Sequence, residues 1–77
     1  MSASEIANQA ITSGTKLLDH LPANAGNVNA VIPRLDGASG FIRVTLDPSQ
    51  SRIISAGLMS ANQIANGLSS GRFTAIK

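Results

Sequence analysis

The 77-residue sequence contains no cysteine, tryptophan or tyrosine, and only 13% of its residues are charged. Without cysteine there are no disulfides, no thiolate metal ligands and no cysteine nucleophile. One histidine, His20, and four acidic residues are a poor supply of ligands for a structural metal. Small domains usually offset a limited core with disulfides, a metal or oligomerisation. Of these three, the sequence favours oligomerisation.

The composition is nevertheless that of a folding chain. Hydrophobic residues make up 43% and the net charge is +2, whereas disordered chains combine low hydrophobicity with high net charge. Soluble domains average about 25% charged residues, well above the value here. We therefore expect partners to cover much of the surface, namely copies of this chain and other subunits of the same assembly.

No targeting or membrane segment is expected. The first residues, Met1 to Glu5, lack the basic and apolar regions of a secretory signal. The longest uncharged run, residues 53–71, contains asparagine, glutamine and serine, which are costly in lipid. We expect no conventional membrane span and, in a bacterial setting, assembly in the cytoplasm.

The N-terminal segment predicts an amphipathic helix over residues 2–20. Ser2 and Glu5 fit a capping box, in which the Ser2 hydroxyl accepts a hydrogen bond from the Glu5 backbone amide. Apolar residues then recur every three or four positions and form one stripe. Pro22 ends the helix, because the residue before a proline disfavours helical geometry.

Residues 28–46 predict a β-hairpin. Val28 to Pro33 is a short apolar segment, and Phe41 to Leu46 alternates between two faces. Asp36-Gly37 lies in the loop between them, as in many hairpins. One face of the second strand is apolar, and consists of Ile42, Val44 and Leu46.

A second helix is predicted over residues 48–67. Asp47 suits the cap, Pro48 suits the first helical position, and Gly67 suits a left-handed C-terminal cap. Within this helix, small residues four apart allow another backbone to approach closely. Such a strip packs either against the first helix of the same chain or against a second copy of the chain. The residues concerned are Gly57, Ala61 and Ala65, with Leu58 beside them.

The tail, residues 68–77, contains a segment with two interpretations. Phe73 to Ile76 either adds to a neighbour's sheet edge or belongs to a loosely docked tail. The whole chain, residues 1–77, is thus predicted to be one small α+β domain in the order helix, hairpin, helix and tail. Both helices are expected on the hairpin's apolar face, with oligomeric packing as further support. The predicted subunit contacts are Gly57, Leu58, Ala61, Ala65, Phe73 and Ile76.

Nothing in the sequence predicts an enzyme. The serines lack a Gly-x-Ser-x-Gly turn, and the glycines form no phosphate-binding loop. Asp19 and His20 adjoin, but neighbouring residues of a helix point in different directions. His20 is expected to interact with the C-terminal end of the first helix. We expect no catalytic, cofactor or metal site.

The basic residues leave two roles open. Arg34, Arg43 and Arg52 either pair with carboxylates across subunit contacts or contact phosphates. Phosphate contact needs a clustered basic face, and single-strand binding needs aromatic rings for stacking. The basic residues are dispersed and the sequence has two phenylalanines as its only aromatic residues. The carboxylate role is favoured, with a small nucleic-acid-binding protein as an alternative.

One short segment resembles a known family. Ser60 to Asn66, Ser-Ala-Asn-Gln-Ile-Ala-Asn, is similar to the Asn-x-Ile-Ala-Asn segment of flagellar rod and hook proteins, which carry it near the N-terminus. The resemblance implies an axial, rod-type subunit. Composition and size favour a related class, a structural subunit of a bacteriophage virion such as a minor capsid, cement, tail or ejection-channel protein. That is the predicted function and location, with the axial subunit as the alternative.

Overall fold

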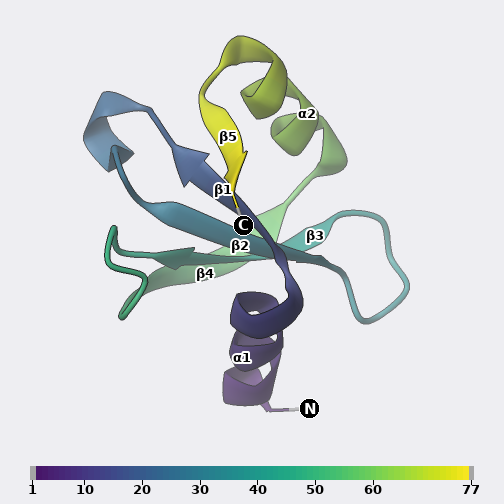
Figure 1. The fold of residues 1–77 in the computed structure, drawn as a ribbon. Coiled ribbons are helices and arrows are strands. Elements are labelled where there is room, and N and C mark those ends of the chain that lie inside the picture. The colour runs from purple at the N-terminus through teal and green to yellow at the C-terminus, as the bar shows by residue number, and fades with distance from the viewer. Residues whose placement is uncertain (1, 77) are drawn as a thin grey trace.

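The computed structural model describes residues 2–76, which form one antiparallel sheet with one α-helix on each face. The strand order is β4-β3-β2-β1-β5 (Figure 1). The α+β class is confirmed, but the predicted order of helix, hairpin and helix is wrong. The elements are α1 (Ala3–Ser13), β1 (Thr15–Asp19), a short 3-10 helix (Pro22–Asn24), β2 (Val28–Pro33), β3 (Phe41–Leu46), β4 (Ile53–Met59), α2 (Ala61–Ser70) and β5 (Phe73–Ile76).

The first helix begins as predicted and ends seven residues early. Ser2 Oγ accepts from the Glu5 amide at 3.2 Å, and Glu5 Oε1 accepts from the Ser2 amide at 3.1 Å, so the capping box is confirmed. The helix ends at Ser13 because Gly14 passes close to β2. A Cβ on Gly14 would lie 2.4 Å from the Ala10 carbonyl oxygen and 2.8 Å from that of Val31. The predicted helical segment 15–19 is instead β1, which pairs with β2.

The predicted hairpin is confirmed as β2 and β3. The two strands pair from Val28 opposite Leu46 to Pro33 opposite Phe41. The alternation predicted for β3 is also observed, because its apolar face lies in a core beneath α1. That core consists of Ala10, Val28, Ala30, Ile32, Val44 and Leu46.

The predicted second helix, residues 48–67, is wrong as far as Ser60. Asp47 caps a turn instead of a helix: its Oδ1 accepts from the backbone amides of Ser51 at 3.0 Å and Arg52 at 3.2 Å. β4 follows the turn, and α2 begins only after Ser60. Ser60 and Gln63 form a second capping box, equivalent to the one at Ser2.

The second helix lies on the face of the sheet opposite α1, not on the hairpin's apolar face with it (Figure 1). Its buried contact is Gly67, which faces the ring of Phe73. Phe73 belongs to a second core with Leu17 and Val31, and Ile64 of α2 packs against this core. Gly67 is therefore a packing position within the helix, and the C-terminal cap is Gly71, with φ of 82°.

Of the two alternatives for the tail, the structure shows a strand, but one that pairs inside its own subunit. β5 pairs antiparallel with β1, from Asp19 opposite Phe73 to Lys16 opposite Ile76. Lys77, also in the predicted tail, lies outside the described residues. Oligomeric packing stays a prediction. In the part of the chain that the structure describes, neither helix is long and apolar enough to cross a membrane.

Candidate functional site

The predicted subunit contacts are distributed over three elements. Gly57 and Leu58 lie on β4, whereas Ala61 and Ala65 lie on α2. The strip of small residues four apart is therefore not a helix face, because the chain changes from strand to helix at Ser60. Ala61, Ala65 and Leu58 are exposed, and Leu58 has the largest exposed fraction of the large hydrophobic residues, 61%.

Phe73 and Ile76 do not form a free contact surface. Phe73 is 4% exposed and packs under α2 in its own subunit. Ile76 is partly buried against the core beneath α1. Between them, Thr74 and Ala75 have exposed side chains.

The most exposed apolar element is β4, an edge strand that pairs only with β3. Its seven residues, Ile-Ile-Ser-Ala-Gly-Leu-Met, include no charged residue and no proline. Ile53 is 48% exposed and Ile54 is 50% exposed. Soluble proteins usually protect an edge strand with charge, proline or a bulge, because its unpaired backbone groups can pair with another chain. Here a shift of register near Ile53 is the only such device seen among the described residues.

The three predicted arginines are not brought together. Arg34 follows β2 and Arg52 precedes β4, so they lie at opposite ends of β3. Arg34 pairs with Asp36 of its own loop at 2.6 Å. The hydrogen bond from Arg34, helped by one from the Ala38 amide, lowers the pKa of Asp36. Asp36 is thus already paired within its own subunit.

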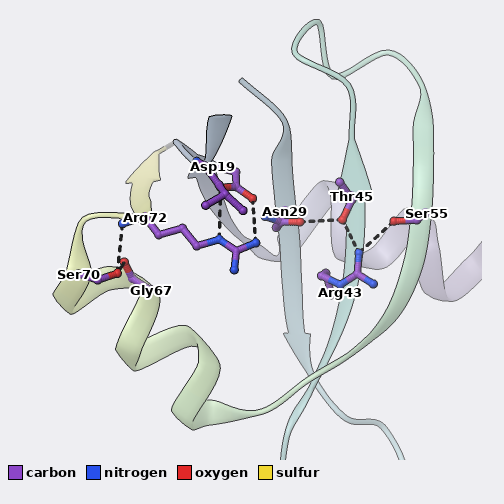
Figure 2. A network of polar contacts seen from close by, with 9 residues as sticks. Asp19, Asn29, Arg43, Thr45, Ser55, Gly67, Ser70 and Arg72 are labelled. Carbon is purple, nitrogen blue, oxygen red and sulfur yellow. Dashed lines mark hydrogen bonds and ion pairs between the residues drawn. The ribbon is translucent and has the colours of Figure 1, made fainter. Parts of the chain in front are cut away.

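Arg43, in the middle of β3, instead belongs to a polar row across the sheet on the α2 side. Asn29, Thr45 and Ser55 are direct cross-strand neighbours on β2, β3 and β4. Thr45 donates to Asn29 Oδ1 at 2.7 Å. Nη1 of Arg43 donates to the hydroxyl of Thr45 and, at 3.1 Å, to that of Ser55 (Figure 2).

A second arginine, in the turn between α2 and β5, lines the same pocket as this row. Arg72 donates to both carboxylate oxygens of Asp19 at 3.4 Å, and its guanidinium lies 4.9 Å from the ring centroid of Phe73. The side chain of Asp19 is 4% exposed and also accepts from the Leu21 amide at 2.9 Å. His20, next to Asp19, is exposed and contacts Thr74, so the predicted interaction with a helix end is wrong.

Between α2 and this row lies an open pocket of about 670 Å³. One wall is a polar face of α2, whose members recur at spacings of three and four: Gln63, Asn66, Gly67 and Ser70. The floor is the polar row with Arg43 and the Asp19–Arg72 pair. Apolar residues of β4 complete the lining. We call this cavity the α2 pocket.

Sequence reasoning named Arg43 but missed its partners. Asn29 and Thr45 come together only through the register of three strands, and Arg72 reaches Asp19 only because β5 pairs with β1. One signal was present: Asn29 is the single strongly polar residue in the apolar segment 28–33. A buried polar side chain needs a partner, which pointed to this face of the hairpin.

Comparison with known proteins adds no relative. No family model matches the sequence, and the searches of curated proteins and of solved structures find no significant match. The function is therefore argued from the geometry of β4 and of the α2 pocket.

Proposed function

We propose that the chain is a non-enzymatic structural subunit that self-associates through β4. The observation that carries this proposal is the exposed, uncharged β4 edge with Ile53, Ile54 and Leu58 at its surface. A second strand placed along this edge satisfies its unpaired backbone groups and covers these side chains.

The partner strand we propose is β4 of a second copy. Two copies related by a two-fold axis place their β4 strands antiparallel, so the joined sheet remains antiparallel throughout. β4 is seven residues long, whereas the opposite edge, β5, has only four, of which Phe73 and Ile76 pack against the cores of their own subunit. Pairing of β4 with β4 therefore covers more apolar surface than pairing of β4 with β5.

The wider assembly we propose is a bacteriophage virion, built in the bacterial cytoplasm, with other subunits covering the remaining surface. Low charge, small size and the β4 edge support this class. A flagellar-type axial subunit is the alternative within it. The nucleic-acid alternative gains no support from the arginines, because Arg34 pairs with Asp36 and lies at the other end of β3 from Arg52.

The test is the mass of the purified protein between micromolar and submillimolar concentration, measured by sedimentation equilibrium. We expect dimers or larger species for the wild type. Leu58→Lys places a charge on the β4 edge and should yield monomers. Leu35→Lys is the matched control, because Leu35 is 46% exposed but lies in the loop between β2 and β3.

Two outcomes contradict the proposal. One is a wild type that remains monomeric and folded over the whole concentration range. The other is equal association of the Leu58→Lys and wild-type proteins, which would show that the contact lies elsewhere.

A further inference from the structure

Arg43 is a positive charge without a carboxylate partner in the described residues. The ion pairs among residues 2–76 are Arg34 with Asp36 and Arg72 with Asp19. The remaining acidic side chains, Glu5 and Asp47, serve the cap of α1 and the turn before β4. A guanidinium has five N–H donors, and the observed partners of Arg43, two hydroxyl groups, use Nη1 alone.

The surroundings hold this guanidinium in one place. Thr45 links it to Asn29, which is 4% exposed, and Ser55 holds it from β4. Gly57, directly opposite Arg43 on β4, supplies the space: a Cβ there would lie 2.8 Å from Nη2. A charged group positioned in advance loses less entropy when a ligand binds.

The lining of the α2 pocket carries more positive than negative charge. Its ionisable lining is Arg43, Arg72 and Asp19, which gives two positive charges and one negative charge. The observed hydrogen bonds of Asn29 use its oxygen, so its amide nitrogen adds further donors to this floor. Arginine recognises carboxylates and phosphates through paired N–H bonds.

We propose that the α2 pocket binds a carboxylate group at Arg43. The single uncompensated positive charge matches a singly charged carboxylate, whereas a phosphate monoester carries nearly two negative charges at pH 7 and would face the buried Asp19. The volume of about 670 Å³ leaves room for a larger body, whether a small organic acid or an acidic peptide segment. Gln63 and Asn66 offer amide groups to such a body, and Leu58 and Met59 offer apolar contact.

The residues proposed to bind the carboxylate are separate from the β4 edge, and the two surfaces share Ile54 and Leu58. Arg43 and Asn29 lie within the sheet face under α2, while the proposed subunit contact is the outer edge of β4. Failure of one proposal therefore leaves the other in place, provided that binding is also measured on an Ile53→Lys protein, in which the new charge on β4 lies outside the residues that line the pocket.

The experiment is an NMR titration of the wild-type protein, followed through backbone amides and arginine Nε–H groups. The probes are N-acetylglutamate α-amide, its neutral counterpart N-acetylglutaminamide, sodium acetate, inorganic phosphate and a short oligothymidylate. We expect saturable shifts at Asn29, Arg43, Thr45 and Ser55 with the glutamate derivative. The neutral counterpart should bind with an affinity at least about tenfold lower. Equal affinity for acetate indicates recognition of the carboxylate alone, whereas weaker acetate binding indicates a peptide-like body.

Three variants make the titration decisive. Arg43→Gln should weaken binding of the glutamate derivative about tenfold. Gly57→Ala keeps every charge but displaces Nη2, so it should also weaken binding while the spectrum stays that of a folded protein. Arg52→Gln makes the same change in charge in an exposed turn and should leave the affinity within about twofold.

The proposal is overturned by any of four results. These are the absence of saturable shifts in the wild type, equal affinity for the glutamate and glutamine derivatives, tighter binding of phosphate or oligothymidylate, and equal losses in Arg43→Gln and Arg52→Gln.

Discussion

Among the glycines of the described residues, Gly67 makes the closest contact with another side chain, the ring of Phe73. A Cβ on Gly67 would lie 2.1 Å from Cδ2 and 2.5 Å from Cε2 of the ring. Carbon atoms pack at about 3.5–4.0 Å, so the ring or the helix must move by about 1.4 Å to accept a methyl group. Phe73 is 4% exposed and lies between α2 and the sheet, so neither can move freely.

We predict that Gly67→Ala lowers the free energy of unfolding by about 2 kcal/mol. Overpacking typically costs about 1–3 kcal/mol, and the severity of this overlap favours the upper end. Alanine regains about 1 kcal/mol through its higher helix propensity. The measurement is urea unfolding at a fixed protein concentration, because self-association adds to apparent stability.

A double-mutant cycle separates this steric cause from others. In a Phe73→Leu background the smaller side chain leaves room, so Gly67→Ala should become neutral or stabilising there. Gly71→Ala, at the C-terminal cap of the same helix, is the control. Its cost of about 1 kcal/mol comes from the left-handed backbone, with φ of 82°, because no atom beyond its two chain neighbours lies within 4 Å of the added Cβ. That cost should be equal in both backgrounds. The reasoning is refuted if Gly67→Ala costs the same with Phe73 and with Leu at that position.

Two further predictions concern the acidic side chains. Arg72→Gln should cost about 1–3 kcal/mol in urea unfolding, because Asp19 is buried and keeps only the Leu21 amide; the lower end is favoured since the Arg72 side chain is 44% exposed. The same change in an Asp19→Asn background should cost less, and equal costs would show that the pair is not coupled. The hydrogen bond from the Ser49 hydroxyl, with those from two backbone amides, lowers the pKa of Asp47 in the folded state. Its stabilisation is therefore present above about pH 4 and is lost as the pH falls through the folded pKa. Asp47→Asn keeps the acceptor oxygen and should show a shallower loss of stability below pH 4, and identical pH profiles would contradict this origin.

Local signals in the sequence predicted the structure correctly where neighbouring residues determine it. The capping box at Ser2 and the strands of the hairpin, 28–33 and 41–46, were predicted at their observed bounds or within one residue of them. Each depends on neighbours a few residues away or on a clear alternation of polar and apolar residues.

The prediction failed where a strand lacks alternation. β4 is exposed on most of its length, so its residues show no period of two, and Ile54, Leu58 and Ala61 happen to recur at helical spacings. The pair of β-branched residues at 53 and 54 and the capping box at Ser60 were the signals for a strand followed by a new helix. Asp47 and Pro48 suit a tight turn as well as a helix start, and sequence alone does not separate the two.

The candidate site depends on tertiary structure more than the helices and strands do, so less of it could be predicted from the sequence. Arg43 was recognised as a charge in need of a partner, but its neighbours Asn29 and Ser55 are set by strand register. The closure of the sheet by β5 brings Arg72 to Asp19 from 53 residues away in the sequence. No local pattern encodes either arrangement.

The most direct test of self-association through β4 is amide hydrogen exchange as a function of protein concentration. In a free monomer the outward amides of β4 face solvent and exchange rapidly. We predict that protection within residues 53–59 increases from micromolar to submillimolar concentration, while protection of β5, at the other edge, stays constant. Unchanged exchange in β4 over a range in which the protein associates, or a concentration-dependent increase at β5 instead, would contradict the assignment of β4 as the subunit contact.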